Sequence, residues 1–328
     1  MGINFTRHRH QATPPILSII LTIVDGGNTL AQCLKALASQ TNLRELEILV
    51  PFDHITAEAR QFVLQYPDFK FIDLGCVMKG RVPQNDLEKH AFYNVRRAKA
   101  LKLATGQLVA IIEDRGRPRP DWANAMTALH ARGDYAAIGG AVENGIDRIW
   151  NWAVYFCDFG RYQAPLSDHD PEYLTDTNIC YQRKDLMALE YLWKDSYEEA
   201  QVNWELKRRG RPMLLSDLAR TVQYRSQISG LSLARERFGW GRSFGQVRGR
   251  NLHGATRIKL ILFMPAMPFV LLFRQIRLQK EKRHSFLKYT ISLPAVIFLL
   301  SFWSVGELVG YIETRSNASP ISSKYPRA

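Results

Sequence analysis

Acidic residues follow three short apolar runs in the first half of the chain. They are Asp25, Asp53 and the adjacent pair Glu113-Asp114. The runs before them are rich in Ile, Leu and Val and are short enough to be buried strands. Ligands of open α/β sheets bind beyond the carboxyl ends of the strands. These acids therefore mark a candidate ligand site at one edge of a predicted sheet.

A second acidic pair, Glu198-Glu199, stands at the start of a predicted helix. A positioned carboxylate can take a proton from a reacting hydroxyl, which accelerates such reactions by about 10²–10⁴. The same pair is also favoured at a helix N-terminus by the helix dipole alone. Spacing by itself leaves both interpretations open.

Arginines alternate directly after the acids at 113 and 114: they are Arg115, Arg117 and Arg119. Alternate side chains of an extended segment share one face, and guanidinium groups there can bind phosphate through paired hydrogen bonds. The alternative is a solvated loop whose charges shield the neighbouring acids. We favour phosphate binding for Arg115 and the solvated loop for the other two arginines.

The elements that must position these residues alternate between strand and helix patterns. This alternation predicts an α/β fold with parallel strands and helices on both faces of the sheet. The predicted strands are Ile16–Val24, Leu46–Val50, Phe69–Leu74 and Leu108–Ile112, and the predicted helices are Asn28–Ser39, Thr56–Gln65 and Asp86–Ala104.

Composition narrows the function classes. Of the 328 residues, 46% are hydrophobic, which excludes disorder as the main state. Lys and Arg number 44 against 31 Asp and Glu, and the net charge of +13 indicates an anionic partner. The four cysteines are scattered without a Cys-x-x-Cys pair, so neither a zinc module nor a disulfide scaffold is expected.

Charge and hydropathy divide the second half of the chain. Residues 207–259 hold thirteen basic and two acidic residues. Two uncharged stretches follow, Leu260–Phe273 with two prolines and Tyr289–Gly306. A spanning helix needs about 20 apolar residues, and two crossings would place the basic loop 274–288 opposite the preceding domain, against the positive-inside rule. We therefore predict that the first stretch is re-entrant or interfacial, and that the second is interfacial or spans once.

The basic segment 235–250 mixes arginine with aromatic residues and glycine. Nucleic-acid binding is one interpretation, but no RNA-binding signature occurs and apolar stretches follow. Because each basic residue near anionic lipid contributes about 1 kcal/mol, we predict an anionic membrane as partner and no nucleic acid. The nine-residue run Ile16–Val24 contains Ser18 and Thr22 and lacks a cleavage site, so it is no secretory signal. The domain is expected on the cytoplasmic face.

Five segments, in order over residues 14–225, resemble the family 2 glycosyltransferases with the GT-A fold. They are LSIILTIVDGG, LEILVPFD, NVRRAKALKLATGQLVAIIEDRGRPRPDW, TDTNICYQRKDL and YEEAQVNWELKRRGR. A membrane-associated bacterial branch of that family is similar in three further features, Glu113-Asp114-Arg115, GGAVENG at 139–145 and WSVGELVG at 303–310. The resemblance implies a mixed sheet flanked by helices, with a Rossmann-like nucleotide-binding part.

The resemblance also implies an inverting, hexosyltransferase-like enzyme of polysaccharide biosynthesis. Its donor would be a nucleotide sugar, UDP-linked on family grounds, and its acceptor a lipid-linked or envelope glycan. Glu199 takes the place of the general base, with Glu198 beside it, and Asp114 that of a ligand to Mg²⁺ or Mn²⁺. Arg115 stands where the family has its last acid, which leaves metal dependence open. The nucleotide-binding candidates are Thr22, Asp25, Asp53, Arg97, Glu113, Asp114 and Arg115, and the acceptor candidates are Thr177, Asn178, Trp204, Trp240 and Arg242.

Several of these residues have a structural alternative. They are Asp53 as a helix cap, Arg97 on a solvated helix face, Thr177 and Asn178 as turn residues, and Trp204 as a core residue. For the whole chain, the alternative is a catalytically impaired relative that binds nucleotide sugar or a partner enzyme. It is favoured by the departures from the family's acids at Arg115 and Glu199.

The predicted organisation has five parts. They are a flexible N-terminus (1–13), a GT-A domain (14–225), a basic amphipathic connector (226–257), membrane-associated helices (258–312) and a flexible tail (313–328).

Overall fold

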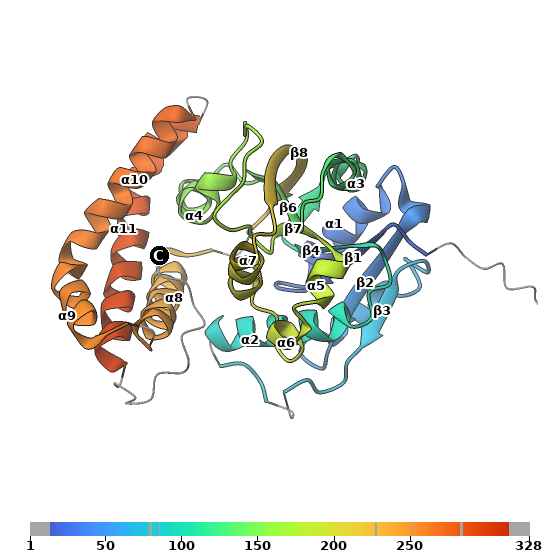
Figure 1. The fold of residues 1–328 in the computed structure, drawn as a ribbon, viewed down its shortest axis with the longest axis horizontal. Helices are drawn as coiled ribbons and strands as arrows, with labels where there is room; N and C mark the ends of the chain where they lie inside the picture. The colour runs from blue at the N-terminus through green and yellow to red at the C-terminus, as the bar shows by residue number, and fades with distance from the viewer. Residues whose placement is uncertain are drawn as a thin grey trace, which may run out of the picture.

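The computed structural model describes residues 14–78, 81–84, 86–226, 228–250, 252–282 and 285–314. The termini predicted to be flexible lie outside these residues, except for positions 313 and 314. Figure 1 shows an α/β part and a group of C-terminal helices, α8 to α11, beside it.

A mixed sheet of eight strands forms the centre of the α/β part, in the order β3-β2-β1-β4-β7-β6-β8-β5. The first four in this order run parallel, as the alternation predicts, whereas β7 runs antiparallel to both β4 and β6. β6 and β8 are parallel to each other, so β1, β2, β4, β6 and β8 all end at the same edge of the sheet. The strands are β1 Leu17–Thr22, β2 Leu46–Phe52, β3 Lys70–Asp73, β4 Leu108–Glu113, β5 Gly116–Pro118, β6 Ala137–Asn144, β7 Asn178–Gln182 and β8 Met213–Gln223.

Both faces of the sheet are covered, which is why its strands are apolar runs without a polar face. Neighbouring residues of β1 point to opposite sides: Ile20 joins one apolar cluster, and Ile19 and Leu21 join the other. Helices α1 and α3 cover the second face, and α2, α4 and the C-terminal helix α11 contribute to the first. The helices of this part are α1 Gly27–Ala38, α2 Asp86–Leu101, α3 Trp122–Arg132, α4 Ile149–Phe159, α5 Arg183–Met187, α6 Glu190–Trp193 and α7 Glu199–Arg208, with short 3₁₀ turns η1 Leu43–Glu45, η2 Ala57–Phe62 and η3 Gly160–Tyr162.

The helix predicted at Thr56–Gln65 is wrong, because this segment forms only η2 and turns. Within η2, only Ala59 is buried, and Leu64 after it is 94% exposed. A short helix depends on burying an apolar face, and this segment buries almost none. Pro67 also follows closely and disfavours helical backbone in the residue before it.

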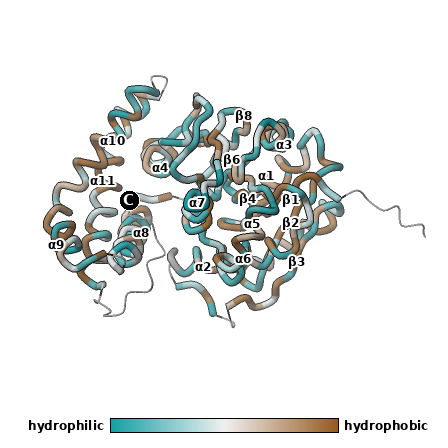
Figure 2. Tube along the Cα trace, in the orientation of Figure 1, coloured by the Kyte–Doolittle hydropathy of each residue, from teal (hydrophilic) through white to brown (hydrophobic). Residues whose placement is uncertain are grey.

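The C-terminal helices are longer than the uncharged stretches from which they were predicted. Two stretches of 28 residues, Gly254–Glu281 and Phe286–Glu313, are long and apolar enough to cross a membrane. Figure 2 shows hydrophobic residues along α9 and α11 and hydrophilic ones towards the end of α10. The elements are α8 Gly230–Arg250, α9 Gly254–Phe263, η4 Met264–Ala266, α10 Met267–Glu281 and α11 Phe286–Glu313.

Helices α8 and α11 meet backbone to backbone through glycines. A Cβ atom added at Gly245 of α8 would lie 2.3 Å from the carbonyl oxygen of Glu307, and one at Gly306 of α11 would lie 2.1 Å from that of Phe238. Gly241 and Gly310 make equally close approaches. This seam explains the spacing of glycines in both helices, since any larger residue would push the helices apart.

We therefore expect Gly245→Ala to lower the stability of the protein. The added methyl has no room, and overpacking of this kind costs about 1–3 kcal/mol. Thermal unfolding in mild detergent measures the loss. The matched control is Gly239→Ala on the same helix, where a Cβ would meet nothing within 4 Å. Equal melting temperatures for the two variants would contradict the seam.

Candidate functional site

The buried guanidinium of Arg97 lies at the carboxyl edge of the sheet and joins four elements. Its Nε donates to Thr22 Oγ1 at the end of β1 over 2.8 Å, and its Nη2 donates to Glu113 Oε1 at the end of β4 over 3.2 Å. Its Nη1 donates to Asp176 Oδ2 over 2.5 Å and to Asn94 Oδ1 over 3.1 Å. The alternative that places Arg97 on a solvated helix face is wrong, because the residue is fully buried.

Asp176 is a site residue that the sequence analysis missed. It lies just before β7, is 8% exposed and pairs with Arg97. An acid directly before a buried strand, in the run Thr175-Asp176-Thr177-Asn178, was the available signal. It repeats the acid-at-strand-edge pattern of β1, β2 and β4, with the strand direction reversed.

Glu198 and Glu199 lie where α7 begins, close to the same guanidinium. Glu198 Oε1 accepts a hydrogen bond of 2.9 Å from Asn94 Nδ2. Burial and then the charge of Asp176 raise the pKa of Glu199 to about 8, although Arg97 opposes the shift. Burial and Asp176 likewise raise the pKa of Glu113. Several carboxylates share one guanidinium here, and the negative charge of Asp176 adds to burial in favouring the protonated forms of Glu199 and Glu113.

Asp114 faces the backbone of the β1–α1 loop. Its Oδ2 accepts hydrogen bonds from the Gly26 N–H over 2.7 Å and from the Asp25 N–H over 3.1 Å. Burial raises its pKa to about 7, against these hydrogen bonds. The side chain therefore shapes the loop at the end of β1, where Gly26 adopts a positive φ of 69°.

Arg115 and Asp25 form a two-bond ion pair above this loop. Arg115 Nε donates to Asp25 Oδ2 over 2.8 Å, and Nη2 donates to Oδ1 over 2.5 Å. Both side chains are 21% exposed, so the pair is reachable from solvent. The other two alternating arginines have separate partners: Arg117 lies 3.5 Å over the ring of Tyr224, and Arg119 pairs with Glu143.

Asp53 is buried at the end of β2, where it stabilises the turn that follows. Its Oδ1 accepts hydrogen bonds from the Ile55 and Thr56 N–H groups, and its Oδ2 accepts one from Arg96 Nη1 over 3.1 Å. Arg96 in turn donates to the carbonyl of Ile23 over 2.7 Å. The capping alternative thus fits Asp53, although a turn and η2 follow it, not an α-helix.

Asn178 of β7 is fully buried and hydrogen-bonds to β6 and β8 through its side chain. It accepts from Trp122 Nε1 over 2.8 Å and donates to the carbonyls of Ala141 and Ala219. Thr177 beside it is 6% exposed. These two residues lie at the same sheet edge as Arg97, and all polar groups of the Asn178 side chain are used within the protein.

The three remaining acceptor candidates lie on helices. Trp204 of α7 is 40% exposed, so its alternative as a core residue is wrong. Trp240 of α8 packs edge-on against His90 at 4.6 Å between ring centroids, and His90 Nδ1 lies 3.3 Å from Asn94 Nδ2. Arg242 instead pairs with Glu313 of α11 at 2.7 Å. The structure therefore links Trp240 to the buried cluster and leaves Arg242 apart from it.

The carboxylates do not form a metal site in this arrangement. Among the described residues, no group of three His, Cys, Asp or Glu side chains could hold a metal ion. The Asp114 oxygens receive backbone N–H groups, while Asp25 is paired with Arg115 and Glu113 with Arg97. Positive charge at this edge comes from guanidinium groups.

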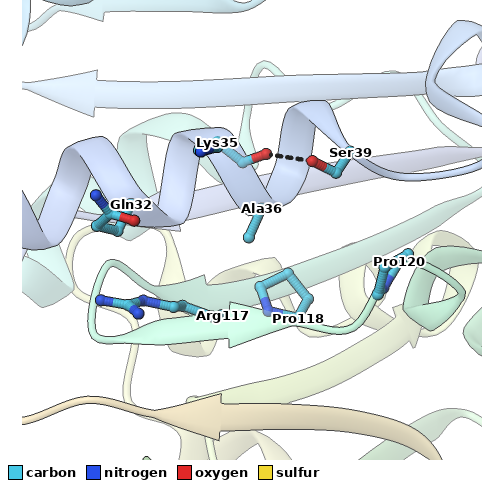
Figure 3. Close-up of a pocket in the computed structure, with 7 residues that line it drawn as sticks. All are labelled: Gln32, Lys35, Ala36, Ser39, Arg117, Pro118 and Pro120. Atoms are coloured by element: carbon cyan, nitrogen blue, oxygen red, sulfur yellow. Dashed lines mark hydrogen bonds between the residues drawn. The ribbon is translucent and has the colours of Figure 1, made fainter.

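Two hollows lie outside the buried cluster. Figure 3 shows the first, of about 300 Å³, between α1 and β5, with Lys35 and Arg117 among its lining residues. The second, of about 380 Å³, lies at the carboxyl end of β6 and includes Glu143, Trp152 and Gln163. None of the predicted catalytic residues lines either hollow.

Comparison with known proteins decides the fold. No family model matches the chain, and no curated protein matches it at a significant level. The chain is similar to the mannosyltransferase PcManGT from Pyrobaculum calidifontis, solved with GDP-Man and Mn²⁺, with a TM-score of 0.54 and 15% identity over 92% of this chain and 90% of that one. The fold is of the GT-A type.

A second similar structure is GalNAc-T7 with UDP, GalNAc and Mn²⁺, at a TM-score of 0.45 and 11% identity over 70% of this chain and 48% of that one. The first likeness alone confirms the predicted GT-A architecture of a mixed sheet flanked by helices. The roles of the site residues are therefore argued from the contacts described above and not from these similar structures.

Replacing Arg97 should be strongly destabilising. Arg97→Met leaves Asp176 and Glu113 without their buried partner, and breaking such a pair costs about 3–5 kcal/mol. Denaturant unfolding measures the change. Lys99→Met, at an exposed position of the same helix, is the control and should change stability little. A loss below about 1 kcal/mol for Arg97→Met would contradict a central role.

The raised pKa of Glu199 predicts how stability depends on pH. Because the folded pKa of about 8 exceeds the ordinary 4.5, the folded protein holds this proton more tightly than the unfolded chain. The stabilisation is complete below pH about 4.5 and is lost as pH rises through about 8. Glu199→Gln should therefore flatten the fall in unfolding free energy between about pH 5 and 9.

Denaturant unfolding across this pH range is the measurement. The control is Glu205→Gln on the same helix, because arginine partners lower the pKa of Glu205 to about 2 and place its titration below this range. If the unfolding free energy of Glu199→Gln falls with pH as steeply as that of the unmodified protein, the raised pKa of Glu199 is contradicted.

Proposed function

We propose that the protein transfers a sugar from a nucleotide-sugar donor, with inversion at the anomeric carbon. The observation that carries the proposal is the half-buried carboxyl of Glu199, with its raised pKa, at the carboxyl edge of a GT-A sheet. Such a group is poised to accept a proton near neutral pH. The proposed donor is UDP-linked, and the enzyme is assigned to the membrane-associated bacterial branch of family 2, as hexosyltransferase-like.

In the proposed reaction, the Glu199 carboxylate takes the proton of an acceptor hydroxyl. The acceptor oxygen then forms a bond to the anomeric carbon while the bond from that carbon to the diphosphate oxygen breaks. The leaving nucleoside diphosphate keeps the bonding electron pair. Glu198 and Asn94 orient the start of α7, and Arg97 and Asp176 set how readily Glu199 gives up its proton.

Positive charge for the leaving group is assigned to Arg115. Its guanidinium is held at the loop after β1 by Asp25 and remains partly exposed. A diphosphate can share or replace that carboxylate, because guanidinium binds phosphate in the same two-bond geometry. Asp53 and Thr22 lie at the ends of β2 and β1, where the nucleoside is proposed to bind. A divalent cation would then be needed less than in relatives with a third acid at this position.

The proposed location is the cytoplasmic face of the membrane, with a lipid-linked or envelope glycan as acceptor. Support comes from two apolar helical stretches next to the basic helix α8. The acceptor residues proposed are Trp204, Thr177 and Trp240, and the predicted acceptor residue Asn178 instead holds the strands beside Thr177 in place. Trp240 is the one that couples α8 to the buried cluster through His90.

A second candidate is a non-catalytic relative that binds nucleotide sugar or a partner enzyme. One observation favours it: the carboxylates of Asp25, Glu113 and Asp114 all have partners within the protein. Turnover separates the two candidates, since only the enzyme predicts release of nucleoside diphosphate.

The test is calorimetric titration of detergent-purified protein with UDP and GDP, first with Mn²⁺ and then with EDTA, followed by assay of UDP- and GDP-sugar turnover. We expect binding that survives EDTA and weakens about 10–100-fold in Arg115→Ala, the range for losing charged hydrogen bonds of 1.5–3 kcal/mol. Glu199→Gln should keep binding and lower turnover by about 10²–10⁴.

Two controls match these variants. Arg119→Ala removes an arginine paired with Glu143, and Glu205→Gln removes an acid of α7 paired with arginines. Neither should change nucleotide affinity or turnover. Binding that requires Mn²⁺ would show that a metal ion, and not Arg115, neutralises the diphosphate. Binding without any turnover favours the second candidate. No binding to either nucleotide contradicts the enzyme and leaves only a relative that binds a partner enzyme at the membrane.

A further inference from the structure

Helix α11 and its neighbour α8 are packed against the α/β part, which limits how a membrane can meet the C-terminal helices. We propose that the stretch 254–281 lies in the plane of an anionic membrane and enters only the leaflet that faces the α/β part, and that 286–313 stays packed behind it, so that neither stretch crosses. This proposal rests on the membrane attachment in the proposed function and specifies its form.

Helix α11 begins and continues against the α/β part. Lys288 Nζ pairs with Asp147 at 2.7 Å, and the Tyr289 ring packs edge-on against Phe156 with centroids 5.1 Å apart. Further along, Phe298 packs against Trp150 at 5.6 Å. Tyr289, Val296 and Leu299 belong to the same apolar cluster as the sheet. The first half of α11 is therefore a core helix of the α/β part and cannot be surrounded by lipid.

The second half of α11 is covered by α8, which is too charged to lie in hydrocarbon. The glycine seam brings the two backbones into contact at Gly306 and Gly310. Arg235, Arg242 and Arg248 are exposed along α8. Each charged side chain at the centre of a bilayer costs at least about 2.5–3.5 kcal/mol. A crossing by α11 would drag this helix into the membrane.

Helix α8 is itself anchored to the α/β part. Arg237, which is 6% exposed, pairs with Asp158 at 2.5 Å, and Trp240 packs against His90. The domain, α8 and α11 therefore form one packed unit. Helices α9 and α10 lie on the side of α11 that faces away from the α/β part (Figure 1), and this is the side that lipid is proposed to contact.

The stretch from α9 to α10 presents the surface that lipid would contact. Of the most apolar segment of this stretch, only 6% is buried within the protein, whereas the corresponding share in α11 is 50%. Leu262, Phe269 and Phe273 are 76%, 72% and 69% exposed. Phe269 and Phe273 stand four residues apart on α10 and share one helical face, and Leu262 lies on α9 before the 3₁₀ turn η4. An exposed apolar stripe of this kind suits a helix lying at the membrane interface.

Charge placement also fits a helix that lies flat. Basic residues stand at both ends of the apolar part, Arg257 and Lys259 before it and Arg274 and Arg277 after it. A flat helix keeps all of them at the headgroups of one anionic leaflet, where each contributes about 1 kcal/mol. The uncharged run Leu260–Phe273 between them extends only about 21 Å, short of the roughly 30 Å hydrocarbon core.

Side-specific cysteine labelling tests the topology in the full chain. In a Cys76→Ser/Cys157→Ala background, a single cysteine replaces Thr256 or Glu281, the two ends of the outer stretch. A matched variant that keeps Cys76, which is exposed on the α/β part, reports the side of that part. Membrane-impermeant maleimide is applied to spheroplasts and to inverted membrane vesicles of the expression host.

We expect all three variants to label in inverted vesicles and not in spheroplasts. Labelling of Thr256→Cys and Glu281→Cys from opposite sides would overturn the in-plane arrangement while leaving membrane attachment intact. Absence of the protein from the membrane fraction would overturn the attachment itself, and this proposal with it. Neither readout depends on glycosyl transfer.

A second measurement tests the contact surface. Binding of the purified protein to vesicles of 70% phosphatidylcholine and 30% phosphatidylglycerol should weaken at least tenfold in Phe269→Asp and in Leu262→Asp. The control is Leu64→Asp, an apolar residue of the α/β part that is 94% exposed. If Phe269→Asp and Leu262→Asp bind the vesicles as tightly as Leu64→Asp and the unmodified protein do, the assigned lipid surface is overturned.

Discussion

The arrangement of the site depends on one buried guanidinium. Arg97 joins the ends of β1 and β4 to the segment before β7, and its own helix brings Asn94 to Glu198. Burying a charge is costly unless it is paired and hydrogen-bonded. Here the partners are the acids at the sheet edge, so the same contacts that satisfy Arg97 also fix where those acids lie and how readily Glu199 ionises.

A second constraint, the glycine seam between α8 and α11, connects the site to the rest of the chain. Close backbone contact fixes α8 against α11, and α11 completes the apolar cluster on one face of the sheet. Trp240 of α8 thereby reaches His90, whose ring is so buried that its pKa falls to about 4. Helix α8 is thereby joined through His90 and Asn94 to Glu198, which stands beside the proposed catalytic group.

The acids at the strand ends were predictable because the period and length of an apolar run reveal a buried strand. Asp25, Asp53 and Glu113 come together at one edge as the parallel order requires. Their partners were not predictable. Arg96 and Arg97 stand on a helix whose pattern leaves either face open, and Asp176 precedes an antiparallel strand that the alternation of strands and helices does not predict. The helix expected at Thr56–Gln65 did not form because only Ala59 and Phe62 of its apolar residues pack on the core, while Val63 and Leu64 are exposed.

The sequence by itself determined the α/β class, four parallel strands, the acids at their ends and the division into an ordinary first half and a basic, apolar second half. These features are local, since they depend on spacing along the chain. The tertiary structure decided the ion pairs of Arg115 with Asp25 and of Arg97 with Asp176, the backbone partners of Asp114, and the packing of α11 into the core. Each of these joins residues tens of positions apart or more, and burial sets their energies. Spacing along the chain therefore does not predict which charged residues pair with one another in the folded protein.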